Sequence, residues 1–115
     1  DLDFNEPDIG LIEKTLRDHK DCDGIFCDGD LIAMHVIKVA EKVGLKIPED
    51  TELIGYDDLK LNQLVSPTLS SIKQDIELIA KKAIESLIQL IQDSKATLPD
   101  HQTFPVRLIE RDSTR

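Results

Sequence analysis

Two acidic turns hold the side chains of this sequence that are best placed to do chemistry. The first turn, Asp28–Asp30, follows the short apolar run Gly24–Cys27. The second turn, Asp57–Asp58, follows the apolar run Leu53–Tyr56. Short apolar runs bounded by turn residues are typical of buried strands. In open parallel sheets, ligands bind outside the carboxyl ends of the strands, so neighbouring strands would bring both turns to one crevice.

Carboxylates at such a crevice have two chemical uses: they accept hydrogen bonds from a polyol ligand, or they hold Mg²⁺ for phosphoryl chemistry. The second use has a specific form, because Asp28 and Asp30 have the Asp-x-Asp spacing that resembles the first motif of haloacid-dehalogenase-like phosphatases. The first Asp of that motif is the nucleophile. However, Leu31 stands where those phosphatases continue with Gly-Thr, and no convincing later Lys motif follows. The interpretation that we favour for Asp30 is a helix N-cap.

Other catalytic patterns are not found in the sequence. The three histidines, His19, His35 and His101, are scattered without the spacing of metal ligands. Only five glycines occur, and they form no phosphate-binding loop. We therefore expect a protein that is not an enzyme and that uses no metal ion or cofactor.

Composition and charge exclude several classes of partner. The 115 residues include 23 acidic and 14 basic side chains, which gives a net charge of −9. Binding to phosphate backbones needs clustered Lys and Arg, so we expect this chain to bind neither nucleic acid nor an anionic membrane by itself. Apolar stretches such as Leu31–Met34 are too short to span a bilayer. Cys22 and Cys27 are too few for a disulfide scaffold, and we expect Cys27 to be a small buried residue.

The hydrophobic pattern predicts an α/β domain. A first helix begins near Pro7, with Asp8 at its positive end. Strand, helix and strand follow one another within about thirty residues, which predicts a βαβ unit with parallel strands. The remaining elements are read from apolar periodicity and punctuation. The predicted strands are Gly24–Cys27, Leu53–Tyr56, Leu69–Lys73 and Phe104–Glu110, and the later helices are Leu31–Val43 and a helix capped by Asp75 that ends near Gln92.

Five motifs occur in a characteristic order: Gly24–Met34, Gly44–Asp50, Leu53–Asp58, Ser66–Gln74 and Leu108–Thr114. Their order and spacing resemble the C-terminal part of the LacI/GalR family of bacterial transcription repressors. The resemblance implies a parallel-sheet three-layer sandwich, periplasmic-binding-protein-like and here partial. In that family two subdomains close around a small-molecule effector, usually a sugar and sometimes a purine. Operator DNA is read by an N-terminal helix-turn-helix that this sequence does not include.

The resemblance also implies which residues bind the effector. Asp57 matches a carboxylate that accepts hydroxyls of the effector or binds a purine. Phe4 matches an aromatic residue that stacks on the sugar or base, and Gln74 matches a crossover glutamine. Gly29 stands where many sugar-binding members have Asn, and either Asp28 or a water would compensate for that amide. We expect a pentose such as ribose, or another sugar, first and a purine second.

The family comparison further predicts the domain organisation and a homodimer. Residues 1–74 would be part of the C-terminal effector-binding subdomain, and residues 75–102 would be a helix and loop that pack on the N-terminal subdomain. Residues 103–115 would be a strand and tail that return to the C-terminal subdomain. The helix Leu31–Val43 is apolar on more than one face, as a dimer interface requires. The predicted interface residues are Leu31, Met34, Ile37, Leu64 and Val65. The resulting function is effector sensing and dimerisation in a cytoplasmic repressor; the alternatives are a sugar-binding protein of a transport system and, less favoured, the phosphatase.

Overall fold

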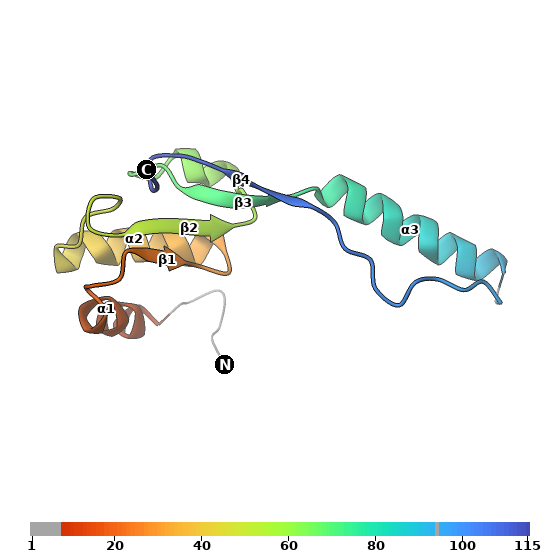
Figure 1. The fold of residues 1–115 in the computed structure, drawn as a ribbon, viewed down its shortest axis with the longest axis horizontal. Helices are drawn as coiled ribbons and strands as arrows, with labels where there is room; N and C mark the ends of the chain where they lie inside the picture. Colours follow the sequence, from red (N-terminus) through yellow and green to blue (C-terminus); the bar gives the residue numbers. More distant parts are fainter. Residues whose placement is uncertain (1–7, 94) are drawn as a thin grey trace. The chain divides into compact units, whose positions relative to one another are not determined.

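The computed structural model describes residues 8–93 and 95–115, which separate into two units (Figure 1). Unit 1 comprises the chain up to Lys73 together with Leu108–Arg115, and unit 2 comprises Gln74–Arg107. The helices in the described part of the chain lack the length and hydrophobicity that a membrane span requires.

Unit 1 is built around the predicted βαβ unit. Strand β1 (Gly24–Phe26) leads into helix α2 (Asp30–Val43), which returns to strand β2 (Glu52–Tyr56). Strand β2 pairs in parallel with β1 on one side and with β3 (Ser70–Gln74) on the other. Strand β4 (Val106–Ile109) completes the sheet order β1-β2-β3-β4. The α/β fold class and the parallel pairing predicted from the sequence are therefore confirmed.

The strand register separates the two faces of the sheet. Gly55 is aligned with Ser71, and both contact Asp30 of α2, so this face lies under the helix. Helix α1 (Ile9–Asp18) packs against α2 on the same side. The alternate residues Phe26 and Tyr56 point to the opposite face, where their rings meet edge to face at 6.4 Å. The α-helices of unit 1 thus form one layer on the sheet.

Strand β1 differs from its prediction. The apolar run was expected to be buried, but Phe26 is 63% exposed and only Cys27, just after the strand, is buried. The cause is the direction of the Phe26 side chain, which points with Tyr56 to the face of the sheet opposite α1 and α2. An apolar run specifies a strand, but it does not say which face of the strand is covered.

A small core lies between α2 and the sheet. Its buried members come from α1, α2 and the ends of the strands: Leu16, Cys27, Ala33, Val36, Ile37, Val39, Ala40, Leu53 and Leu69. Helix α2 ends as predicted at Gly44, whose φ of 76° is a left-handed conformation that glycine adopts without steric cost. Helix α1 also begins as expected, because the Asp8 carboxylate accepts a bond from the Leu11 backbone N–H at 3.0 Å.

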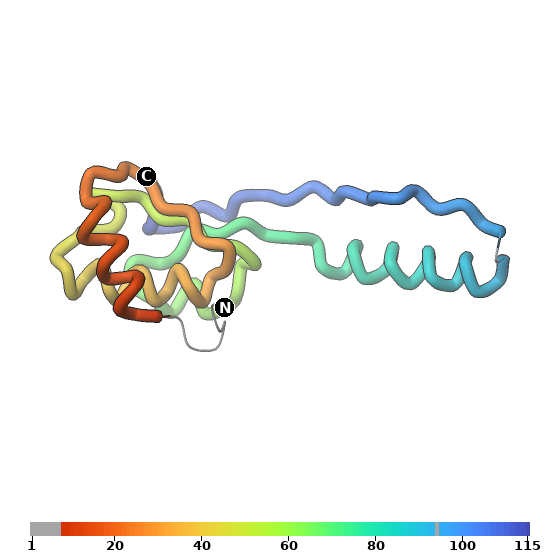
Figure 2. Tube along the Cα trace, turned by 90° about the horizontal axis from the view of Figure 1, so that it is seen from below, coloured from red at the N-terminus to blue at the C-terminus, as the bar shows by residue number. Residues whose placement is uncertain are grey.

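Unit 2 consists of helix α3 (Ile76–Gln92) and the segment after it, which folds back toward the start of the helix (Figure 2). Asp75 caps the helix as predicted and accepts a bond from the Leu78 N–H at 2.9 Å. None of the residues of α3 is buried. Its apolar stripe includes Ile84, Leu87, Ile88 and Ile91, which are 57, 57, 48 and 74% exposed.

Candidate functional site

The structure brings the two acidic turns together. A cavity of about 330 Å³ opens at the carboxyl ends of β1 and β2, and both turns line it. Its lining residues are Asp28, Gly29, Asp30, Leu31, Ile32, Asp57 and Leu59. The geometry that was expected from two neighbouring parallel strands is therefore present, and the cavity lies where open α/β sheets bind ligands.

Asp30 does not have the role expected from the sequence. The N-cap of α2 is Gly29, which has no side chain to cap with, and Asp30 is the first helical residue. Its carboxylate is fully buried and accepts bonds from the Leu59 N–H at 2.7 Å, Asn62 Nδ2 at 2.8 Å and Ser71 Oγ at 2.6 Å. The prediction of a helix cap was wrong, because the partners of this carboxylate lie 29 to 41 residues away and leave no local sequence signal.

The two carboxylates of the second turn have different surroundings. Asp57 is exposed and lines the cavity, whereas the Asp58 side chain is 10% exposed and bonds Arg111 Nη2 at 2.6 Å. Lys73 Nζ lies 3.4 Å from the other oxygen of Asp58. Arg111 also donates from Nη1 to the Leu69 carbonyl at 2.7 Å, so Asp58 is tied to β3 and to the C-terminal segment. The adjacent residues therefore separate into a side chain at the cavity and one committed to the fold.

The backbone of this turn is unusual. Asp57 and Asp58 have φ angles of 106° and 52°, a region that residues other than glycine rarely adopt. Three consecutive N–H groups of the turn are each bound. Asp57 N–H donates to the Ile72 carbonyl at 2.8 Å, Asp58 N–H to Ser71 Oγ at 3.0 Å, and Leu59 N–H to Asp30. Backbone strain of this kind persists only where the surroundings over-determine it.

The remaining predicted effector contacts are placed as follows. Asp28 is exposed at the cavity, and a Cβ added at Gly29 would meet no atom within 4 Å, so the position has open space beside it. Gln74 is the last residue of β3 and is half-buried. Phe4 lies outside the described residues. Sequence reasoning missed Asn62, Ser71 and Arg111, whose roles rest on contacts between distant segments.

The predicted dimer residues divide into two groups. Leu31 and Leu64 are exposed, at 51% and 79% of their surfaces. Met34 and Val65 are half-buried and pack against the core, and Ile37 is itself a member of the core. The two exposed members therefore lie on the first turn of α2 and just after the 3₁₀ helix η1 (Lys60–Gln63).

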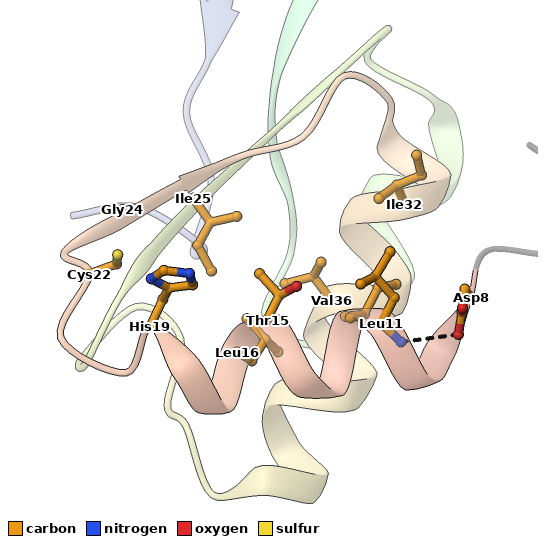
Figure 3. A pocket seen from close by; sticks show the side chains of 11 residues that line it. Asp8, Leu11, Thr15, Leu16, His19, Cys22, Gly24, Ile25, Ile32 and Val36 are labelled. Atoms are coloured by element: carbon orange, nitrogen blue, oxygen red, sulfur yellow. Dashed lines mark hydrogen bonds between the residues drawn. The ribbon is translucent and has the colours of Figure 1, made fainter. Parts of the chain in front are cut away.

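A second cavity, of about 380 Å³, lies between α1, α2 and β1 (Figure 3). Most of its lining is aliphatic, from Leu11, Ile12, Leu16, Ile25, Ile32 and Val36. At one end, the Asp8 carboxylate is engaged by the first turn of α1, and at the other end lie His19 and Cys22 (Figure 3). Polar ligands need several converging hydrogen-bonding groups, which this cavity lacks among the described residues, so the cavity between the acidic turns is the better candidate.

Comparison with known proteins agrees with this geometry. Residues 4–114 match the model of a periplasmic binding protein-like domain. The chain is 34% identical over 105 residues to the sucrose operon repressor of Pediococcus pentosaceus, and 32% identical over 110 residues to the HTH-type transcriptional repressor PurR of Klebsiella pneumoniae. These alignments cover 90% and 94% of this chain and 32% of each relative, so the chain spans about a third of their length.

The fold is also shared with solved structures. One is a LacI family transcriptional regulator from Enterococcus faecalis with bound ribose, which matches 92% of this chain and 39% of its own at a TM-score of 0.78 and 33% identity. An open, mostly parallel sheet with a ligand cavity at its carboxyl edge defines a class of ligand-binding domain. The chain belongs to the family of periplasmic binding protein-like domains, in the form found in LacI-family regulators.

Proposed function

We propose that this chain is the effector-sensing and dimerisation part of a LacI-type repressor that acts in the cytoplasm. The observation that carries the proposal is the exposed Asp57 carboxylate at the cavity between the two acidic turns. An ionised carboxylate can accept hydrogen bonds from two hydroxyls at once, which suits the adjacent hydroxyls of a sugar. The ion pairs of the nearly buried Asp58 with Arg111 and Lys73 support a division of labour between the two residues, in which Asp57 serves the ligand.

We propose a pentose such as ribose as the effector, with a purine as the second candidate. Support comes from the bound ribose of the Enterococcus faecalis regulator, which is 33% identical to this chain. The open space beside Gly29 also favours a ligand that approaches the backbone closely, or a bridging water, at this point of the cavity. A transport-type binding protein would share the architecture, but the curated relatives named above are repressors.

The test is isothermal titration of the full-length protein with D-ribose and with hypoxanthine. Asp57→Asn keeps the size of the side chain and removes its charge. Losing a hydrogen bond to a charged group costs roughly 1.5–3 kcal/mol, so we expect an affinity about 10- to 100-fold lower. Normal binding by a folded Asp57→Asn protein would place the effector elsewhere.

The control for this test must remove a carboxylate of similar exposure away from the cavity. Asp50→Asn is suitable, because the Asp50 side chain is exposed in a loop and, within the described part of the chain, accepts just the local Lys46 N–H bond, at 2.8 Å. Asp58→Asn is unsuitable as a neutral control, since it breaks the bond to Arg111 and should lower stability. We expect Asp50→Asn to bind like the wild type.

We propose further that the protein is a homodimer and that the apolar surface of Leu31, Met34, Leu64 and Val65 is its interface, with Ile37 supporting it from the core. Met34→Asp and Leu64→Asp would each bury a charge at the two-fold axis, which weakens association. Analytical ultracentrifugation of the full-length protein should show dissociation. Ile9→Asp, on α1, is the control and should leave the dimer intact; unchanged association in both test variants would place the interface elsewhere.

In this proposal, operator DNA is bound by a helix-turn-helix segment outside the present sequence. The 115-residue chain has a net charge of −9, and strong DNA binding needs clustered basic residues. A gel shift with this chain alone should show no sequence-specific complex at physiological salt. A specific complex would contradict the assignment of the chain as the sensing part.

A further inference from the structure

We propose that Asp30 is a positioning residue for effector binding: it holds the turn Asp57–Leu59 in its strained conformation and so sets where the Asp57 carboxylate lies. The inference rests on the proposed function, in which Asp57 binds the effector. It assigns to a buried helix residue a role that its position in the sequence does not suggest.

The hydrogen bonds of Asp30 reach the turn by two routes. Its Oδ2 accepts directly from the Leu59 N–H at 2.7 Å. Its Oδ1 accepts from Ser71 Oγ at 2.6 Å, and the same Ser71 oxygen accepts from the Asp58 N–H at 3.0 Å. Asp30 therefore controls two of the three consecutive N–H groups of the turn, one of them through Ser71. The third, from Asp57, is held by the β3 backbone at Ile72.

The turn needs such anchors because two non-glycine residues in succession have positive φ angles, 106° at Asp57 and 52° at Asp58. A relaxed backbone would rotate toward negative φ and would move the Asp57 side chain relative to the cavity. Hydrogen bonds donated to a buried carboxylate are shorter and stronger than those between neutral groups. Asp30 is fully buried, and its three donors are uncharged, so the charge strengthens each of these bonds.

The surrounding structure leaves room for this carboxylate. A Cβ added at Gly55 would collide with Asp30 Oδ1 and would also crowd Leu69, so β2 carries glycine where the carboxylate crosses it. Asn62 contributes a further bond, from Nδ2 to Oδ2 at 2.8 Å, and ties η1 to the same atom. The first turn of α2, strand β3 and the segment after β2 thus meet at one side chain, in the wall of the cavity.

The experiment compares Asp30→Asn with the wild type in the full-length protein, using D-ribose and hypoxanthine as probes. Asparagine keeps the shape, but its single oxygen cannot serve all three donors. We expect the affinity for the bound probe to fall about tenfold, the factor for one hydrogen bond to a charged group. Hydrogen exchange of the Asp58 and Leu59 amides should accelerate, while the amides in the middle of α2 stay protected.

A double substitution separates positioning from general damage. If Asp30 acts through Asp57, the protein with both Asp30→Asn and Asp57→Asn should bind no more than about twofold more weakly than Asp57→Asn alone, because effects on one interaction are not additive. Additive losses would overturn the inference. If Asp57→Asn lowers affinity and Asp30→Asn does not, the inference is also wrong, whereas wild-type affinity in Asp57→Asn refutes the proposed function itself.

Two further variants guard against loss of folding. Ser71→Ala removes only the route to the Asp58 N–H, and we expect a loss of affinity about threefold, smaller than for Asp30→Asn, because the Leu59 bond remains. Ser113→Ala is the matched control. The Ser113 hydroxyl is fully buried, donates to the Leu53 carbonyl at 2.6 Å and accepts from the Ser70 N–H, and none of these bonds includes a residue of the turn. This variant should lower the free energy of unfolding and leave the affinity for the probe within about twofold of the wild type. Equal losses in Ser113→Ala and Ser71→Ala would show that affinity follows stability alone.

Discussion

Helices α2 and α3 have similarly apolar sequences, but they differ in how much of their apolar surface is buried. Helix α2, in unit 1, buries Ala33, Val36, Ile37, Val39 and Ala40 against the sheet and α1. Helix α3, in unit 2, buries none of its 17 residues within the described chain. Amphipathic periodicity therefore indicates that a helix has an apolar face, but it does not indicate whether the covering surface lies in the same chain segment.

The hydrogen bonds of the two units differ in the same way. Around Asp30, Asp58 and Arg111, side-chain bonds join residues 13 to 53 positions apart. In α3 the side-chain bonds are local, such as Lys82 to Glu85 and the Asp75 cap. Long-range bonds of this kind fix several elements at once, whereas local bonds support only one helix.

Truncation of a core residue should separate the two units most clearly. Leu53 is fully buried, so Leu53→Ala in the 115-residue chain should cost about 2–5 kcal/mol of unfolding free energy. Ile88 is 48% exposed, and Ile88→Ala should cost less than about 1 kcal/mol in the same chain. Urea denaturation measures both. In the full-length protein the cost of Ile88→Ala should rise if another segment covers α3, and an equal cost in both proteins would argue against such a cover.

A smaller effect is expected where β2 passes Asp30. Gly55→Ala places a methyl group against the Asp30 carboxylate and 3.2 Å from Leu69 Cδ2. Overpacking of this kind typically costs about 1–3 kcal/mol, and it should also disturb the anchored turn. Thermal unfolding gives the stability. Gly29→Ala is the control, since the added methyl group meets nothing within 4 Å, and a loss of stability as large as that of Gly55→Ala would contradict this account.

Thiol labelling distinguishes the closed core from the open helix. Burial, with the nearby Asp28 and Asp30 carboxylates, raises the pKa of Cys27 to about 11 from its ordinary value of 9.0. In a Cys22→Ser background, Cys27 should therefore resist alkylation at pH 8, because the thiolate is the nucleophile. Adding Ile88→Cys should give rapid labelling in the 115-residue chain. Fast labelling without that substitution would show that the core opens.

The same shift has a consequence for stability at alkaline pH. The folded state disfavours the Cys27 thiolate, so the contribution of this group is fully present below pH 9 and is lost as the pH rises from 9 toward 11. Cys27→Ala should flatten this part of the stability profile measured by urea denaturation. An unchanged alkaline slope would assign it to other groups.

The smallest effects are expected from exposed ion pairs. Glu13 joins two helices, with Lys42 Nζ at 2.6 Å and Arg17 at 2.9 Å, whereas Glu85 bonds Lys82 on its own helix. Hydrogen bonds to these cations lower the pKa of both carboxyls below 4.5. Their stabilisation is therefore present above pH 4.5 and fades as the pH falls through their folded-state pKa values. Glu13→Gln should lower the melting temperature slightly more than Glu85→Gln, and 1 M salt should remove the difference.

Local sequence signals determined most of the elements. The βαβ unit, the Gly44 terminus of α2, the Asp75 cap and the span of α3 all follow from periodicity and capping chemistry, which act over a few residues. The same reasoning placed both acidic turns at one edge of the sheet, because parallel strands end together. The sequence therefore predicted the place of the candidate site as well as the fold class.

Only the tertiary structure decided what the acidic residues do there. Asp30 looked like a cap and is instead a buried acceptor for Leu59, Asn62 and Ser71. Asp57 and Asp58 are identical in type and adjacent, yet one faces the cavity and the other bonds Arg111, 53 positions later. The physical reason is that a carboxylate takes its role from its nearest donors and cations in space, and distant segments supply them only after the chain has folded.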